Sequence, residues 1–174
     1  MDFGKILNKV LDLEGGLKIH KNKGEKDITY AGIYRKAHPN WKGWKYIDKG
    51  EKPPFELVKS FYYQHFYKPF EKIKSDKIKA LLFETAVNVG LRRAIKLAQI
   101  TVDTKDDGIL GPITLSKINN FDEEKFLKYF TLNRIHFYTS LANKKPKRYG
   151  IFLRGWINRA FDSLNFILNE KRRV

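Results

Sequence analysis

The sequence predicts a mainly α-helical fold with a small β-hairpin near its N-terminal end. Apolar residues recur at helical spacing through most of the 174 positions. The run Ile28-Thr29-Tyr30 favours a strand, and it lies in a turn-rich segment between about residues 17 and 50. A hydrophobic fraction of 42% supplies a packed core at this length, which excludes global disorder.

The first part of the chain contains two predicted helices on either side of the turn-rich segment. An amphipathic helix begins at Phe3, and its apolar face consists of Ile6, Leu7, Val10 and Leu11. It ends at Gly15-Gly16, because glycine readily adopts the left-handed conformation that closes a helix. The second helix covers 55–66, after Pro53-Pro54 and before Pro69.

The remainder of the chain is also predicted to be helical. One long helix covers 76–101, and its almost continuous apolar surface predicts burial on most sides. Tight turns follow at Asp107-Gly108 and Gly111-Pro112. We expect three more helices, over 114–119, 121–141 and 151–169, with a basic loop over 143–150 between the last two.

Residue types and motifs that the sequence lacks exclude several kinds of chemistry. The chain has no cysteine, which excludes a disulfide scaffold, a thiol nucleophile and a thiolate zinc site. It contains no glycine-rich phosphate loop, and its four histidines lack compact ligand spacing. We therefore expect no cofactor and no metal, and any catalysis has to come from carboxylates, hydroxyls, amides or histidine.

The net charge of +16 predicts an anionic partner. Nucleic acid, anionic lipid and the acidic bacterial wall all fit, and charge alone does not choose among them. The apolar runs are too short for a transmembrane helix, and no Sec-type signal is visible at the start of the sequence.

Glu14 is the first candidate catalytic residue. It follows Val10 by four positions and Leu11 by three, so it continues the apolar stripe of the first helix. Partial burial and the negative end of the helix dipole both favour the protonated carboxyl. A protonated carboxyl is what a glycosidic oxygen requires from a general acid. The alternative is an ordinary helix-terminal glutamate whose stem packs and whose carboxylate reaches water.

A second carboxylate is needed to activate water or to stabilise the transition state. The turn-rich segment offers Glu25 and Asp27. Asp27 and Thr29 share one face of the predicted strand, so they form a polar wall in which the Thr29 hydroxyl orients a water. The alternative is a solvated turn without catalytic function.

Glu84 and Asn88 form a polar ridge, four positions apart, on the most apolar helix. Buried polar groups need partners. The pair either lines a substrate groove or braces the fold through hydrogen bonds to neighbouring segments.

Trp41, Trp44 and Tyr46 form an aromatic cluster that is interleaved with lysines. Such rings stack on sugars or on bases. The alternative is a small satellite core.

Short motifs occur in a specific order between residues 3 and 165. They are Glu14-Gly15-Gly16, Thr29-Tyr30-Ala31-Gly32-Ile33, Phe83-Glu84-Thr85-Ala86-Val87-Asn88-Val89-Gly90, Gln99 with Asp107-Gly108-Ile109-Leu110-Gly111-Pro112-Ile113-Thr114, Asn133-Arg134 and Gly155-Trp156-Ile157-Asn158-Arg159. In this order and spacing they resemble glycoside hydrolase family 108, the holin-associated muramidases of phages and of related bacterial export systems. The chain departs from the family at Gly24-Glu25-Lys26-Asp27-Ile28-Thr29, where Asp-x-Gly-Gly-x-Thr is usual, and at Glu84, where aspartate is commoner.

The resemblance implies a lysozyme-like, mainly α-helical fold with a small β-hairpin near the N-terminal active-site segment. It implies an endolysin-type muramidase that hydrolyses the β-1,4 bond between N-acetylmuramic acid and N-acetylglucosamine in peptidoglycan. Residues 1–95 would form the catalytic region and residues 96–174 a helical peptidoglycan-binding-like region packed against it. The expected site consists of Glu14, Asp27 and Thr29 for catalysis and of Tyr30, Glu84 and Asn88 for substrate binding.

The expected partners follow from the same resemblance. Peptidoglycan is the substrate, and a holin or an export system releases the enzyme from the cytoplasm to act on the cell wall. We expect a monomer with no specific nucleic acid partner and no stable membrane insertion. Two alternatives remain: a non-catalytic basic module that binds cell wall or nucleic acid, and a membrane-disrupting helix over 151–174.

Overall fold

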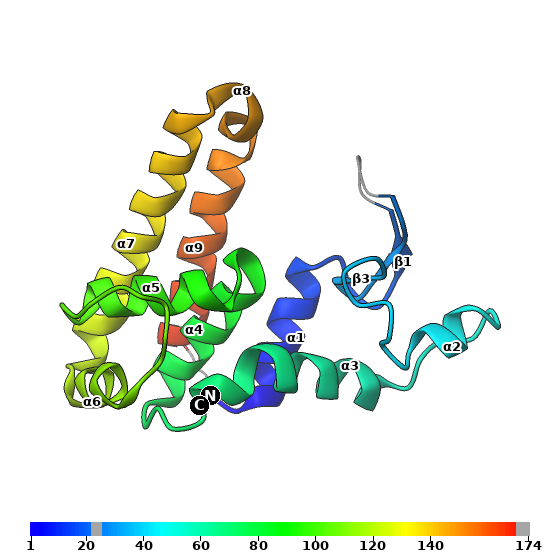
Figure 1. Ribbon diagram of the computed structural model, residues 1–174, viewed down its shortest axis with the longest axis horizontal. Coiled ribbons are helices and arrows are strands. Elements are labelled where there is room, and N and C mark those ends of the chain that lie inside the picture. The colour runs from blue at the N-terminus through cyan, green and yellow to red at the C-terminus, as the bar shows by residue number, and fades with distance from the viewer. Residues whose placement is uncertain (22–25, 170–174) are drawn as a thin grey trace. The chain divides into compact units, whose positions relative to one another are not determined.

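The structure, a computed structural model, describes residues 1–21 and 26–169 (Figure 1). The chain divides into two compact units, Asp2–Lys68, here called the first unit, and Pro69–Val174, here called the second unit. Glu25, the alternative second carboxylate, lies outside the described residues. None of the helices in the described part of the chain is both long enough and apolar enough to cross a membrane.

The first unit combines helices with a small antiparallel sheet. Its elements are α1 (Phe3–Leu13), β1 (Ile19–His20), β2 (Thr29–Tyr30), β3 (Ile33–Tyr34), α2 (Trp44–Ile47), α3 (Phe55–Tyr62) and the π-helical turn η1 (Tyr63–Tyr67). The sheet order is β1-β2-β3, with Thr29 opposite both His20 and Tyr34. The predicted hairpin is therefore confirmed, and a third short strand extends it.

The helix α1 is held at its start and along one face. Asp2 caps its N-terminus by accepting a hydrogen bond from the backbone nitrogen of Lys5, at 2.9 Å. The predicted apolar residues of α1 are buried. At the N-terminal end, the Phe3 ring packs on Tyr63 and Tyr67 of η1, with ring centroids 5.5 and 4.6 Å away. These contacts order α1 and so place its C-terminal residue.

The second unit is entirely helical in its described part. Its elements are α4 (Asp76–Val89), α5 (Leu91–Thr101), α6 (Pro112–Asn120), α7 (Glu123–Lys144), α8 (Pro146–Tyr149), the 3-10 turn η3 (Gly150–Phe152) and α9 (Leu153–Leu168); another 3-10 turn, η2 (Lys68–Phe70), lies at the boundary between the units. Helices α7 and α9 run side by side, and α8 lies at their end (Figure 1). Helix α4 contacts α5, α7 and α9, which explains its burial on most sides.

The predicted single helix over 76–101 is wrong. The chain breaks at Gly90, whose φ of +87° lies in a region that favours glycine, and α5 begins directly afterwards. The apolar spacing continues across the break, so periodicity alone does not reveal it. Because its partners are α5, α7 and α9, α4 lies in the second unit, and the proposed functional division near residue 95 stays a prediction.

The predicted loop over 143–150 is also wrong. Helix α7 extends to Lys144, and α8 begins at Pro146. Proline is favoured at the first position of a helix because its fixed φ suits the helix and its missing N–H would have no intrahelical partner there. The basic side chains of this segment therefore lie on the end of α7 and on α8, and not on a loop.

Candidate functional site

Glu14 is the C-cap residue of α1 and is half-buried. The next two residues, Gly15 and Gly16, have φ values of +91° and +78°. The backbone nitrogen of Gly16 donates to the carbonyl of Leu11 at 2.8 Å, and that of Gly15 donates to Asp12 at 3.4 Å. This is the hydrogen-bond pattern of a Schellman cap, so backbone bonds fix the end of the helix at Glu14.

The turn between β2 and β3 lies against the Glu14 side chain. Its central residues, Ala31 and Gly32, both have positive φ, at +51° and +76°, as a type I′ hairpin turn requires. A Cβ atom on Gly32 would lie 3.0 Å from the Glu14 Cβ and would overlap the Tyr62 hydroxyl. Gly32 therefore allows the backbone of the turn to approach the stem of Glu14.

Tyr62 holds this turn in place. Its buried hydroxyl donates a hydrogen bond to the Ala31 carbonyl at 2.7 Å. Ala31 is fully buried and has a left-handed backbone that non-glycine residues rarely adopt. Such strain persists only where the surroundings enforce it, and it clusters at functional sites. We identify Tyr62 as a positioning residue for Glu14, one that the sequence analysis did not select because its partner lies 31 positions away.

A row of side chains crosses the sheet beside the cap. Thr29 pairs with His20 on β1, and directly opposite residues of antiparallel strands present their side chains on one face. The His20 ring lies next to Gly15, because a Cβ on that glycine would be 3.6 Å from its Cε1. Thr29 is buried. The sheet therefore brings His20, another residue that the sequence analysis did not select, next to the Glu14 cap.

Asp27 is half-buried just before β2. Its Oδ1 accepts a hydrogen bond from the backbone nitrogen of Ile28 at 2.8 Å. The pKa of Arg35 is raised first by its hydrogen bonds to Asp48 and, in smaller part, by the charge of Asp27. Asp27 is thus a locally ordered carboxylate with a cation nearby.

Tyr30, expected to bind substrate, is largely buried at 4% exposure. Its ring stacks on Trp41 with a centroid separation of 6.0 Å. Burial raises the pKa of its phenol, so the hydroxyl is protonated near neutral pH. Trp44 is also buried, and its indole nitrogen donates to the His38 carbonyl at 2.7 Å. Trp44 therefore belongs to the core, whereas Trp41 and Tyr46 are only half-buried.

Glu84 has no exposed surface. Its carboxylate accepts hydrogen bonds from Arg134 on α7, which is equally buried, and from Arg159 on α9 at 2.6 Å. Asn88 is half-buried, and its Oδ1 accepts a hydrogen bond from the Tyr138 hydroxyl. The geometry agrees with the brace alternative for Glu84, because the side chain has no free face for a substrate.

Burial by itself would raise the pKa of the Glu84 carboxyl. The charges of Arg134 and Arg159, and the hydrogen bonds they donate, outweigh that effect and hold the pKa below its usual range. Glu84 is therefore an ionised link between three helices of the second unit.

The motif that combines Gln99 with Asp107 also has a structural basis in the second unit. The Gln99 side chain is buried, and its amide nitrogen donates to Asp107 Oδ1 at 2.9 Å and to the Ile109 carbonyl at 3.0 Å. Its oxygen accepts from the backbone nitrogen of Gly108 at 2.8 Å. One amide therefore orders the loop between α5 and α6.

Replacing Gly32 by alanine tests the close approach at Glu14. We expect Gly32→Ala to cost about 1–3 kcal/mol more unfolding free energy than Gly50→Ala, because the new methyl group overpacks the turn. Gly50 is the matched control: its φ is also +76°, but a Cβ there would meet nothing within 4 Å. Urea denaturation measures both costs. Equal costs would show that the turn is not closely packed against Glu14 and Tyr62.

The chain is similar to known protein families in sequence and to a solved structure in fold. Residues 7–90 match the family described as "Glycosyl hydrolase 108", and residues 88–161 match the "Predicted Peptidoglycan domain". The solved structure of SagA from Brucella abortus is similar to the chain with a TM-score of 0.72 and 19% identity, covering 95% of this chain and 93% of that one. No curated protein is significantly similar in sequence. The likeness to SagA confirms the predicted mainly helical, lysozyme-like fold.

Proposed function

The chain belongs to the glycosyl hydrolase 108 family and is a peptidoglycan hydrolase, and from this premise we propose that it is a muramidase with Glu14 as its general acid. The bond cleaved is the β-1,4 link between N-acetylmuramic acid and N-acetylglucosamine. The observation that carries the proposal is the placement of Glu14, a half-buried carboxyl at a backbone-fixed cap whose stem is packed against Gly32.

Glu14 protonates the leaving glycosidic oxygen in this proposal. A general acid has to be oriented toward the oxygen that it protonates. Two features of the backbone support that orientation here. They are the Schellman hydrogen bonds of Gly15 and Gly16 and the Ala31-Gly32 turn, which Tyr62 holds in place. Both features act on the backbone and the stem of Glu14.

Asp27 is the second carboxylate that we propose, acting on the water or on the developing positive charge of the sugar. Its hydrogen bond from Ile28 orders the side chain. Thr29 has only 3% of its surface exposed. We therefore propose that Thr29 contributes by fixing β2, the strand that begins two residues after Asp27. Glu25 is the alternative to Asp27 for the second carboxylate.

The large positive charge supports an acidic polymeric substrate. A net charge of +16 attracts the acidic peptides and polymers of the wall and raises the encounter rate. We propose that the second unit, which contains the whole of the peptidoglycan-domain match, binds the wall while the first unit carries the hydrolytic carboxyl. Holin- or export-dependent release and the monomeric state stay predictions.

Analysis of the products tests the proposed bond. Purified peptidoglycan is digested with the full chain, the new reducing ends are reduced with borohydride, and the fragments are identified by mass spectrometry. We expect reduced muramic acid ends. Reduced glucosamine ends would indicate the other glycosidic bond, and sedimentation with the wall without new reducing ends would indicate a non-catalytic binding module.

A further inference from the structure

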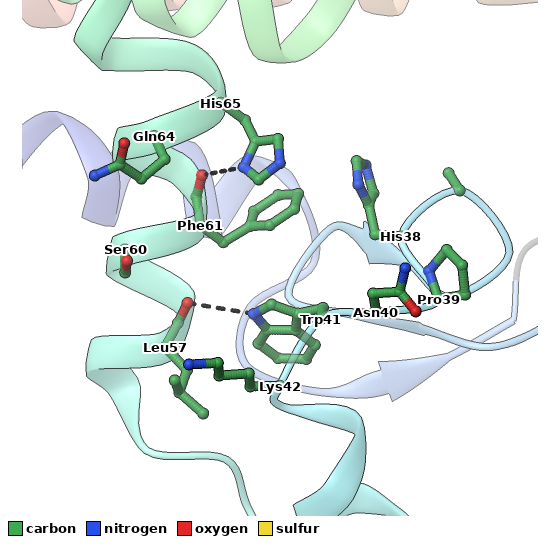
Figure 2. A pocket seen from close by; sticks show the side chains of 11 residues that line it. His38, Pro39, Asn40, Trp41, Lys42, Leu57, Ser60, Phe61, Gln64 and His65 are labelled. Carbon is green, nitrogen blue, oxygen red and sulfur yellow. Dashed lines mark hydrogen bonds between the residues drawn. The ribbon is translucent and has the colours of Figure 1, made fainter.

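A second feature of the first unit is a cavity of about 490 Å³ between α3 and the loop of residues 37–42 (Figure 2). It is open to solvent, and its volume lies in the usual range for sites that take small ligands. Glu14, Asp27 and Thr29 are not among its lining residues. The catalytic proposal therefore leaves this cavity without a function.

Aromatic rings form much of the cavity wall. Phe61 and His65 stack with centroids 4.3 Å apart, and His38 meets Phe61 edge-on at 4.7 Å. Trp41 is half-buried, and its indole nitrogen donates to the Leu57 carbonyl at 3.3 Å, which connects the loop to α3. Figure 2 shows the His38 and Trp41 side chains on the loop side and the Phe61 and His65 rings on the helix side. The rings of the wall thus contact one another across the loop and the helix.

His65 is placed by an unusual backbone. It lies in the π-helical turn η1, a conformation that is rare and is frequent at functional sites. Its Nδ1 lies 2.8 Å from the Phe61 carbonyl oxygen, which can only accept, so Nδ1 carries the proton. In the neutral ring, Nε2 is therefore left as a hydrogen-bond acceptor.

The other lining residues of the cavity include neutral polar side chains and one lysine. Asn40, Ser60 and Gln64 are exposed and supply amide and hydroxyl groups, and Lys42 supplies a positive charge. No carboxylate is among the lining residues. The side chain of Asn40 makes no hydrogen bond with any other residue in the described ranges, so its amide is available to a ligand.

These features select a class of ligand. Ring faces bind the apolar faces of sugars, and neighbouring amides and hydroxyls bind their hydroxyl and acetamido groups. The absence of carboxylates disfavours a cation, and Lys42 favours an acidic substituent. The polar rim disfavours a purely apolar ligand.

We propose that this cavity is a second glycan site that binds an N-acetylated amino sugar, and N-acetylmuramic acid in preference to N-acetylglucosamine because Lys42 meets the lactyl carboxylate. The inference rests on the proposed function for its choice of polymer. The cavity would hold a sugar unit of the strand apart from the residues assigned to hydrolysis. Burial, and then the charge of a protonated His65, lower the pKa of His38, which favours the neutral form of its ring.

Binding of monosaccharides to the full wild-type chain tests the site without any hydrolysis. A monosaccharide contains no glycosidic bond between sugars, so the result does not depend on whether the chain is a muramidase. N-acetylmuramic acid, N-acetylglucosamine and glucose are titrated while backbone amide and indole signals are followed by NMR. We expect saturable shifts at Trp41, Gln64 and His65, with affinity falling in the order in which the three sugars are named.

Four variants locate the binding. His65→Ala and Gln64→Ala should each weaken the binding of N-acetylmuramic acid by about five- to tenfold, since each removes a hydrogen-bonding group. Lys42→Gln should remove the preference for N-acetylmuramic acid and leave binding of N-acetylglucosamine unchanged. His136→Ala is the matched control, because His136 is an exposed histidine on α7, and it should bind like the wild type.

The proposal is overturned if shifts fail to saturate, if they map away from residues 37–65, or if His65→Ala and Gln64→Ala both bind like the control. An unchanged preference for N-acetylmuramic acid in Lys42→Gln would overturn the role of Lys42. Binding without hydrolytic activity would overturn the muramidase proposal alone. Hydrolysis with no binding at this cavity would overturn the second glycan site alone.

Discussion

Glu14→Gln is expected to lower the rate of peptidoglycan hydrolysis by about 10²–10⁴-fold, the usual contribution of a general acid. Glutamine has the same shape as glutamate but has no acidic proton to give. The fold should persist, because the stem still packs against Gly32 and the cap bonds of Gly15 and Gly16 come from the backbone. Loss of turbidity of a peptidoglycan suspension measures the rate, and thermal unfolding checks the fold.

Glu51→Gln is the control for this substitution. Glu51 is an exposed glutamate of the same unit, outside α1 and the sheet, and its variant should hydrolyse peptidoglycan like the wild type. Asp27→Asn is the companion variant: it keeps an oxygen for the Ile28 bond and removes the charge, so a smaller loss is expected. A wild-type rate of hydrolysis in Glu14→Gln would contradict the assignment of Glu14 as general acid. A wild-type rate in Asp27→Asn would assign the role of second carboxylate to Glu25.

Glu84→Gln is expected to lower the free energy of unfolding by about 3–5 kcal/mol, because it leaves the buried guanidinium of Arg134 without its counter-charge. Glutamine fills the same volume, so the change isolates the charge. Urea denaturation measures the loss. Glu124→Gln is the control, since Glu124 pairs with Lys128 on the exposed surface at 3.5 Å and should cost under about 0.5 kcal/mol. Equal costs would contradict a buried ionic brace.

The pH dependence of stability gives a second measurement on Glu84. Its pKa in the folded chain lies below the ordinary value. The stabilisation is therefore complete above the unfolded-state pKa of about 4.3 and is lost as pH falls from there through the folded-state pKa. Below about pH 4.3, the wild type should lose stability more steeply than Glu84→Gln.

The secondary structure predicted from the sequence differs most clearly from the observed structure at Gly90 and Pro146. The apolar spacing of the predicted 76–101 helix persists through Gly90, so periodicity cannot distinguish one helix from two that meet at a positive φ. Pro146 lies among basic and polar residues that resemble a loop, yet it begins α8. In both cases the backbone conformation at one residue decides the outcome, and the residue type allows either.

The same division holds for the site. The spacing of α1 indicated that Glu14 continues a buried stripe and that Gly15-Gly16 ends the helix, because these are contacts between residues three to five positions apart. The turn that meets Glu14 depends on Tyr62, whose partner Ala31 is 31 positions away. No local pattern encodes that contact.

The sequence by itself determined the helical class, the small sheet, the cap that carries Glu14, and the polar ridge of Glu84 and Asn88, since each is written in short-range periodicity or in turn residues. Only the tertiary structure decided what the ridge does. Arg134 and Arg159 reach Glu84 from 50 and 75 positions away and enclose its carboxylate completely. Whether a polar residue on an apolar helix meets a substrate or an arginine depends on which helix packs over it, and that is a property of the assembled core.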